Sequence, residues 1–177
     1  GMLAEHPRLS KNAEIRHAPE VVAPDDKPSH ALRRLTKSSM RLAIDSVHTG
    51  ESQGVVSAGN TGALMAISKV ILKTQEGIDR PAMISYFPTI RGESSMVDLG
   101  ANIECDANNL VQFAIMGAAF ARSVMGIERP TVGLLNVGSE DLTGHEEVRA
   151  ANQILKKSIF DFDYHGFVEG NNIGEGL

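Results

Sequence analysis

The chain has 177 residues, of which 42% are hydrophobic and 22% are charged, a composition typical of an ordinary globular protein. Its length suits one domain with a sizeable core, so we expect a single domain over residues 1–177. The formal net charge of −5 argues against a general nucleic-acid binder, which would carry a basic field. No apolar run approaches the roughly 18 to 20 residues that span a bilayer, and no leader stands at the start. We therefore expect a cytoplasmic protein.

Short apolar runs alternate with longer amphipathic stretches along the chain. Six runs predict strands: EIRHA (14–18), GVVSA (54–58), AMISYF (82–87), SMVDL (95–99), TVGLLNV (131–137) and FDYHGFV (162–168). Four stretches predict helices: 29–48, with Pro28 suited to the first turn, 61–73, 108–125 and 146–157. This alternation indicates a layered α/β domain around a mostly parallel sheet. Only the loop 88–94 separates AMISYF from SMVDL, so these two are expected to form an antiparallel hairpin.

Three apolar runs end in glycine with a side-chain amide nearby: VVSAGNTG, VDLGAN and LLNVGSE. The carboxyl ends of parallel strands form the ligand-binding rim of an open α/β sheet, so we expect the three loops to meet in one crevice. Glycine lets the backbone approach a ligand, and a helix beginning at Asn60 or Thr61 leaves its first N–H groups free for an anion. The alternative is a tight turn in which one of these side chains caps the helix. Neither GxGxxG nor GxxxxGK[ST] is present.

For the other titratable groups near these loops, a chemical role and a structural role are again the two alternatives. Asp98, Glu140 and Asp141 can accept protons or can bond N–H groups of their own turns. The single cysteine, Cys105, excludes an internal disulfide, argues against a cysteine metal cluster and has no convincing histidine partner for nucleophilic chemistry. Gly1 before Met2 is typical of a cleaved purification tag.

A basic cluster stands out in an otherwise acidic chain. Between Lys27 and Ile44 no acidic residue occurs, and the basic residues are Lys27, Arg33, Arg34, Lys37 and Arg41. On one helix the spacing of four would place Arg33, Lys37 and Arg41 on a shared face. That face is either a solvated helix surface or a docking surface for an acidic partner or a phosphate group.

The segments SAGNTGALM, GIDRPA, DLGAN, LVQFAIMG and ERPTVGLLNVG, in this order and spacing, resemble the bacterial phosphate acyltransferase (PlsX) family of fatty acid and phospholipid synthesis. The resemblance covers residues 14–170. It implies acyl transfer from acyl carrier protein to inorganic phosphate, giving acyl phosphate. It also implies a three-layer α/β/α fold similar to isocitrate dehydrogenase and phosphotransacetylase, a homodimer, and no metal or organic cofactor.

The resemblance also assigns site residues. Phosphate is itself the nucleophile, so such an enzyme must position the anion and stabilise an oxyanion rather than supply a serine or cysteine. We expect catalytic roles for Asn60, Thr61 and Asn136. Substrate contacts are expected from Ser57, Gly59, Gly62, Asn102 and Gly138. From charge complementarity alone, the acidic acyl carrier protein is expected to dock on Arg33, Arg34, Lys37 and Arg41.

The chain also departs from the family pattern. The family's initial strand with its AMGGD-type loop and its later DGFxGN-type loop are absent, so the fold is expected to be incomplete. The surface helices through which the family is thought to touch membrane are absent too, which leaves at most a peripheral membrane contact outside this chain. Thr143 stands where the family commonly has lysine. The alternative function is a non-catalytic module that keeps the fold, the dimer surface and carrier binding.

Overall fold

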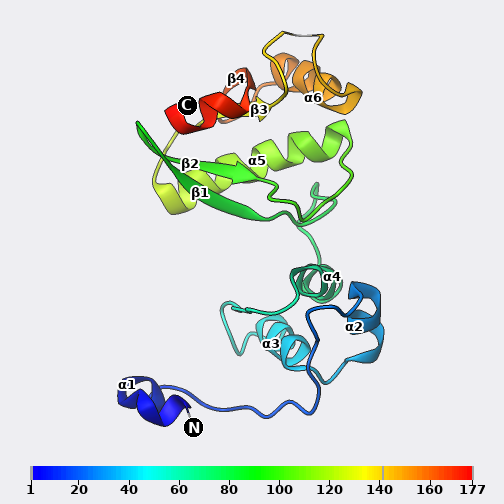
Figure 1. Cartoon of the computed structure of the whole chain (residues 1–177), viewed down its shortest axis with the longest axis vertical. Coiled ribbons are helices and arrows are strands. Elements are labelled where there is room, and N and C mark those ends of the chain that lie inside the picture. Colours follow the sequence, from blue (N-terminus) through cyan, green and yellow to red (C-terminus); the bar gives the residue numbers. More distant parts are fainter. Residues whose placement is uncertain (1, 141, 177) are drawn as a thin grey trace. The chain divides into compact units, whose positions relative to one another are not determined.

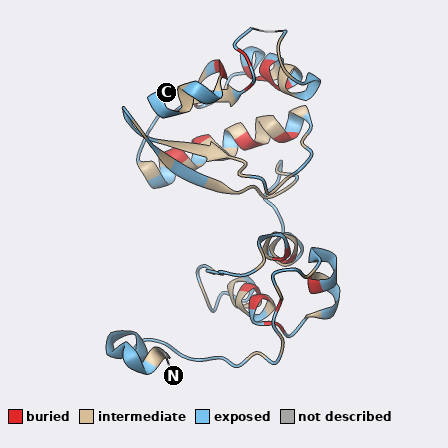
Figure 2. Cartoon of the chain, in the orientation of Figure 1, coloured by how far each residue is buried: buried red, intermediate tan, exposed pale blue. Residues whose placement is uncertain are grey.

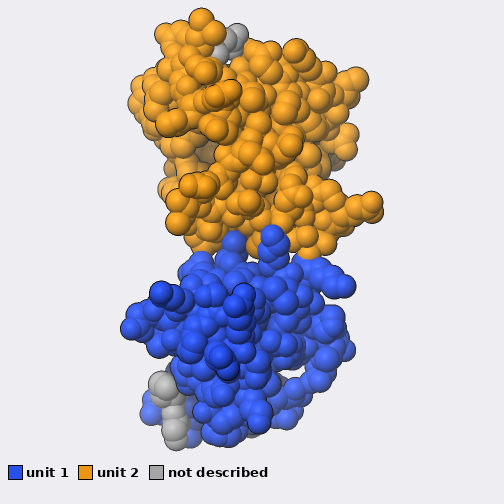
Figure 3. All heavy atoms as spheres, turned by 90° about the vertical axis from the view of Figure 1, so that its right-hand side faces the viewer, with its two compact units in different colours: residues 1–73 blue, residues 74–177 orange. Residues whose placement is uncertain are grey.

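The computed structural model describes residues 2–140 and 142–176 (Figure 1). Asp141, one of the predicted proton acceptors, lies outside the described residues. The chain forms two compact units, Gly1–Lys73 (unit 1) and Thr74–Leu177 (unit 2), which Figure 3 colours separately. The prediction of a single domain stays a prediction. The α/β class is confirmed, with helices in both units and two small sheets in unit 2.

Unit 1 is helical. Its elements are the 3₁₀ helix η1 (Met2–Glu5) and the α-helices α1 (Pro7–Ser10), α2 (Pro28–Arg34), α3 (Ser39–His48) and α4 (Thr61–Ile71). Helix α4 packs against both α2 and α3. The buried hydrophobic residues, among those red in Figure 2, form one cluster of Val22, Ala31, Met40, Ile44, Ala63 and Ile67. This core is purely aliphatic, because residues 1–73 contain no phenylalanine, tyrosine or tryptophan.

The prediction of one helix over 29–48 was wrong, because the chain breaks between α2 and α3. The Ser38 side chain, fully buried, donates to the Leu35 carbonyl at 2.7 Å and accepts from the Arg41 N–H at 3.3 Å, so it caps α3. Glu20 also stabilises the segment between the two helices, because its carboxylate accepts a hydrogen bond from the Lys37 N–H at 2.8 Å. Pro28 does begin α2, as predicted.

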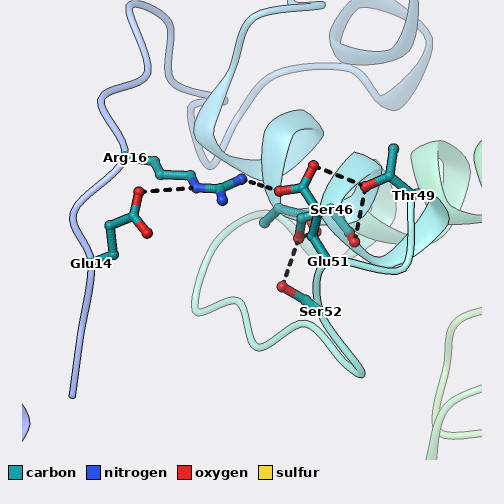
Figure 4. A network of polar contacts seen from close by, with 7 residues as sticks. Glu14, Arg16, Ser46, Thr49, Glu51 and Ser52 are labelled. Atoms are coloured by element: carbon teal, nitrogen blue, oxygen red, sulfur yellow. Dashed lines mark hydrogen bonds and ion pairs between the residues drawn. The ribbon is translucent and has the colours of Figure 1, made fainter.

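The segments EIRHA and GVVSA contain no strand, contrary to prediction. Unit 1 holds no sheet among its described residues, and an extended segment without a partner strand leaves its backbone groups to water. Side chains hold EIRHA instead (Figure 4): Arg16 donates to Glu51 and also lies 3.7 Å from Glu14. The Thr49 hydroxyl, near the end of α3, donates to Glu51 at 3.3 Å.

Unit 2 carries both sheets. Its elements are β1 (Ile84–Thr89), β2 (Gly92–Val97), α5 (Ala107–Met125), β3 (Thr131–Leu135), α6 (Glu146–Lys157), β4 (Asp163–Val168) and the 3₁₀ helix η2 (Gly170–Glu175). Strands β1 and β2 form the predicted antiparallel hairpin, and β3 pairs with β4 in parallel. The hairpin turn is shorter than the predicted 88–94 loop, because Thr89 already lies opposite Gly92. Pro88 is tolerated because β1 is an edge strand.

Helix α5 organises unit 2. It begins with a capping box of Asp106 and Asn109 and ends at Gly126 in the left-handed conformation. It packs against β2, β3 and α6, and the buried centre of that packing comprises Ala118, Leu155 and Phe162. Within the described residues, no helix combines the length and the apolar character that crossing a membrane requires.

Candidate functional site

In unit 1 the predicted site residues lie in the loop that leads into α4, from Ser57 to Asn60, and in the first turn of α4, at Thr61 and Gly62. The Asn60 side chain is the N-cap: its Oδ1 accepts from the Ala63 N–H at 2.9 Å. Its Nδ2 donates to the carbonyls of Ala23, Pro24 and Asp26 at 3.3, 3.0 and 2.9 Å. An amide group has two hydrogens, so these donors are fully used. Asn60 therefore fastens the 23–26 loop to the start of α4.

The glycines of this loop permit close packing. A Cβ on Gly59 would lie 3.2 Å from the end of the Met40 side chain, and one on Gly62 would lie 3.0 Å from Cγ of Pro28. The Ser57 hydroxyl accepts from the Gly59 N–H at 3.2 Å. Thr61 is exposed at the first position of α4, where backbone N–H groups have no partner within a helix. The free donors at this point are thus main-chain groups, whereas the Asn60 amide is occupied.

In unit 2 the loop after β2 is built on Asp98. Its carboxylate accepts from the Met83 N–H at 2.8 Å, from the Asn102 N–H at 2.7 Å and from the Asn102 amide at 3.0 Å. The same Asn102 amide donates to the Pro81 carbonyl at 3.1 Å. Burial, the largest single influence, would raise the pKa of Asp98, but these hydrogen bonds and one from Ala101 together outweigh it. The pKa of Asp98 consequently lies below its ordinary value of 3.8.

Replacing Asp98 with asparagine is expected to lower the stability of unit 2 by about 2 kcal/mol at neutral pH, since hydrogen bonds to a charged group contribute about that much. Because the folded-state pKa is lowered, the carboxylate contributes its stability above the ordinary value of 3.8 and loses it as pH falls through the folded value. The difference from the parent should therefore shrink below about pH 4. Urea unfolding followed by tyrosine fluorescence at several pH values measures this, with Glu76→Gln, an exposed acid, as control. A pH-independent difference would contradict the assignment.

The loop after β3 is built on Asn136, which is 9% exposed. Its Nδ2 donates to the carbonyls of Gly138 and Thr143 at 3.0 and 2.9 Å, and its backbone N–H donates to the Val168 carbonyl at 2.9 Å. Gly144, with φ of +92°, lies so close that a Cβ there would stand 2.0 Å from Oδ1 of Asn136. A Cβ on Gly138 would lie 2.9 Å from Cγ2 of Thr143. The loop thus closes tightly around the Asn136 amide.

All three predicted asparagines share one arrangement. Each donates from its side-chain amide to main-chain carbonyls of a loop: Asn60 to 23–26, Asn102 to 81, and Asn136 to 138 and 143. We call these three side chains the amide braces. The sequence indicated the amides but gave no sign of their acceptors, because the carbonyls lie up to 37 residues away. Asn60 belongs to unit 1, and Asn102 and Asn136 belong to unit 2.

The basic cluster does not form one helix face. Arg33 and Arg34 are exposed in the last turn of α2, and Lys37 lies in the break before α3. Arg41 is half-buried, and its guanidinium donates to the Asp45 carboxylate at 3.0 Å. The predicted shared face was wrong because α2 ends at Arg34 and α3 begins only at Ser39. The exposed cations of this cluster are therefore Lys27, Arg33, Arg34 and Lys37.

Cys105 is half-buried in the loop before α5. Burial, the leading influence, raises the pKa of its thiol, although Arg80 acts in the opposite direction. A raised pKa keeps the group in the poorly nucleophilic thiol form at neutral pH. The geometry therefore supports the reading of Cys105 as a non-nucleophilic residue.

The fold is that of an α/β protein. In unit 2 the loops held by Asn102 and Asn136 follow β2 and β3, and in unit 1 the glycine-rich loop held by Asn60 leads into α4. The chain belongs to a family of fatty acid synthesis proteins, because the family model described as "Fatty acid synthesis protein" matches residues 1–177. This confirms the family resemblance.

Curated relatives carry the name phosphate acyltransferase. The protein of Rhodospirillum centenum is 58% identical over 175 residues, covering 99% of this chain and 49% of the relative. That of Caulobacter vibrioides is 55% identical over 174 residues, covering 98% of this chain and 48% of the relative. That of Parvibaculum lavamentivorans is 54% identical over 175 residues, covering 98% and 48%. The chain spans about half the length of these relatives.

Proposed function

We propose that this chain forms part of a phosphate acyltransferase that moves an acyl group from acyl carrier protein to inorganic phosphate. The observation that carries this proposal is the similarity to proteins named phosphate acyltransferase along almost all of the chain. An oxygen of phosphate attacks the thioester carbonyl carbon and forms a C–O bond. The C–S bond breaks, and the carrier leaves as its thiol while acyl phosphate is released.

A protein that catalyses this reaction must position the two substrates and stabilise the developing charge, and it needs no nucleophile of its own. In unit 1 the first-turn N–H groups at Thr61 and Gly62, beside the Ser57 hydroxyl and Gly59, are the groups we assign to phosphate or to the reacting carbonyl. The Asn60 amide is already bonded, so we assign it a positioning role through the 23–26 loop.

In unit 2 we assign substrate contacts to the loops of Asn102, Asn136 and Gly138. The Asn136 amide donates to the carbonyls of Gly138 and Thr143, and these hydrogen bonds fix the shape of the loop. In this proposal the other polar groups of the loop contact the ligand. Aliphatic side chains accompany the proposed loops in both units: Val56 is 101% exposed, Ile103 100% and Val137 79%. Exposed aliphatic groups next to polar ones suit a substrate that joins a charged phosphate to an acyl chain.

The direct test incubates the chain with an acyl carrier protein thioester and phosphate, and traps acyl phosphate with hydroxylamine. We expect hydroxamate that depends on phosphate and is lost in Asn136→Ala. Omitting phosphate controls for direct reaction of the thioester with hydroxylamine. Absence of a phosphate-dependent product would contradict catalysis by this chain, and carrier binding, measured separately, would then decide for the non-catalytic module. A preference for coenzyme A thioesters would indicate a different acyl donor.

Carrier docking is expected to depend on the exposed part of the basic cluster. Arg33→Glu combined with Arg34→Glu should weaken binding of acyl carrier protein at low salt at least tenfold, because two attractions to an acidic partner become repulsions. Arg41→Glu should have a smaller effect on docking, since Arg41 already pairs with Asp45. Titration calorimetry measures both, with Arg8→Glu, exposed in α1, as the matched control. Equal affinities for all variants would contradict the docking surface. The homodimeric state and the cytoplasmic location stay predictions.

A further inference from the structure

The loops to which we assign substrate contacts carry no positive side chain of their own. Residues 57–62, 98–104 and 136–144 contain no lysine, arginine or histidine, and their charged residues are the acids Asp98, Glu104, Glu140 and Asp141. Inorganic phosphate is an anion at neutral pH, and like charges repel. A cation that reaches these loops from elsewhere in the chain would supply the missing attraction.

Arg80 reaches the loop after β2. Its Nη1 donates to the Glu104 carbonyl at 3.0 Å, although the two residues are 24 positions apart in the sequence. The next residue, Pro81, accepts from the Asn102 amide at 3.1 Å. Arg80 therefore lies beside the Asn102 loop, to which we assigned substrate contacts.

Hydrogen bonds hold the backbone on both sides of Arg80. Before it, the Asp79 N–H donates to the side chain of Gln112 in α5 at 2.8 Å, and the Gln112 amide donates back to the Asp79 carboxylate at 2.7 Å. After it, the Met83 N–H donates to the Asp98 carboxylate at 2.8 Å. A side chain on a fixed backbone loses less freedom when it binds a ligand.

The Arg80 guanidinium has donors left for a ligand. It carries five N–H groups, and among the described residues it makes one hydrogen bond, to a neutral main-chain carbonyl. Arg16, Arg41 and Arg129 each form an ion pair with a carboxylate, whereas Arg80 forms none within the described part of the chain. A planar guanidinium fork matches two oxygens of a phosphate group.

We propose that Arg80 binds the phosphate substrate, with two of its unused N–H groups donating to two phosphate oxygens beside the Asn102 loop. The identity of this anion rests on the proposed function. A phosphate held by two oxygens still has an oxygen available to attack the thioester carbonyl. The alternative cation is Arg149 of α6, which donates to the Leu142 carbonyl in the loop after β3 at 3.0 Å. We favour Arg80 because its neighbour Pro81 bonds directly to Asn102.

Phosphate binding can be measured without turnover, by titrating the chain with inorganic phosphate at constant ionic strength and following phosphorus NMR. Arg80→Gln should weaken binding about tenfold, and Arg80→Lys, which keeps the charge but not the fork, should weaken it less. Arg122→Gln is the matched control and should bind as the parent does. Arg122 is also half-buried and donates to a main-chain carbonyl, that of Asp161 at 2.8 Å, but it lies in the last turn of α5.

Three results of this titration overturn the proposal. They are a parent chain that binds no phosphate, unchanged affinity in Arg80→Gln, and an equal loss in Arg122→Gln, which would reflect overall charge. A loss in Arg149→Gln but not in Arg80→Gln assigns the anion to Arg149 instead. Tyrosine fluorescence shows that each variant is folded.

The single cysteine reports where the phosphate lies. Cys105 follows Glu104; burial raises the pKa of its thiol, and the charge of Arg80 acts against this. Phosphate bound at Arg80 brings negative charge close to the thiol, so alkylation by iodoacetamide should slow about twofold when phosphate replaces chloride. The slowing should disappear in Arg80→Gln and remain in Arg122→Gln. An alkylation rate in the parent that does not depend on phosphate overturns the proposal.

Turnover separates this inference from the proposed function. If the hydroxamate assay gives product, Arg80→Gln should raise the KM for phosphate and leave the KM for the acyl carrier protein thioester nearly unchanged. An unchanged KM for phosphate overturns the proposal. If no product forms while phosphate binding and slowed alkylation both depend on Arg80, the anion site stands and catalysis by this chain is contradicted.

Discussion

Gly144→Ala is expected to destabilise unit 2 by about 4 kcal/mol, from a left-handed backbone strain of about 1 to 2 kcal/mol and the loss of bonds to a buried amide. The new Cβ would stand 2.0 Å from Oδ1 of Asn136, and a buried side chain at that distance must leave its place. Leaving breaks its bonds to Gly138 and Thr143. Urea unfolding followed by tyrosine fluorescence measures the loss, because both tyrosines, Tyr86 and Tyr164, lie in unit 2.

Two further variants separate the causes. Gly126→Ala carries the same kind of backbone strain, with φ of +72°, but its Cβ would meet nothing within 4 Å, so it should cost only about 1 to 2 kcal/mol. In the double variant Asn136→Ala with Gly144→Ala the obstructing amide is gone. Its cost should be smaller than the sum of the single costs by at least 1 kcal/mol, which is the sign of a direct contact. Additive costs would contradict the close packing of Asn136 on Gly144.

Asn60→Ala is expected to destabilise unit 1 by about 3 kcal/mol, since it removes a helix cap worth about 1 kcal/mol and the bonds to the 23–26 loop. Unit 1 contains neither tyrosine nor tryptophan. The loss should therefore appear as an earlier helical transition by circular dichroism while the tyrosine transition stays in place. A parallel shift of the tyrosine signal would contradict the assignment of this brace to unit 1.

Asn60→Ser and Asn60→Asp separate the contribution of the helix cap from that of the hydrogen bonds to the 23–26 loop. Both can cap α4, but neither can donate an amide to the carbonyls of Ala23, Pro24 and Asp26. Each should recover about 1 kcal/mol relative to Asn60→Ala, which is the contribution of the cap. Full recovery in Asn60→Ser would show that the bonds to the 23–26 loop contribute nothing to stability.

Local signals predicted α4, α5 and α6 well, because each of these helices carries its own evidence in the sequence. The predicted 146–157 helix matches α6 at both ends, and the predicted 108–125 helix differs from α5 by one residue. The break at Ser38 escaped prediction because it depends on Glu20, which is distant in sequence. The strands expected at EIRHA and GVVSA failed for a similar reason, since an apolar run forms a strand only where another strand lies beside it.

The residues of the candidate site were predicted, but their hydrogen-bond partners were not. Residue types and loop positions were visible in the sequence, because glycine and amide residues follow three of the apolar runs. The direction in which each amide donates was not visible, because its acceptors are main-chain carbonyls that have no sequence signature. Gly144 was overlooked for the same reason: its importance comes from Asn136, eight residues earlier, and not from any motif.

The amide braces affect how the proposed phosphate site would respond to pH. Inorganic phosphate changes its own protonation state around neutral pH, so a scaffold that titrated in the same range would change shape together with its ligand. Carboxamides carry no ionisable proton there. Asp98, the carboxylate that accepts from the Asn102 brace, has a lowered pKa and stays charged at neutral pH. The hydrogen bonds that these side chains make are therefore not lost over the range in which phosphate changes its protonation state.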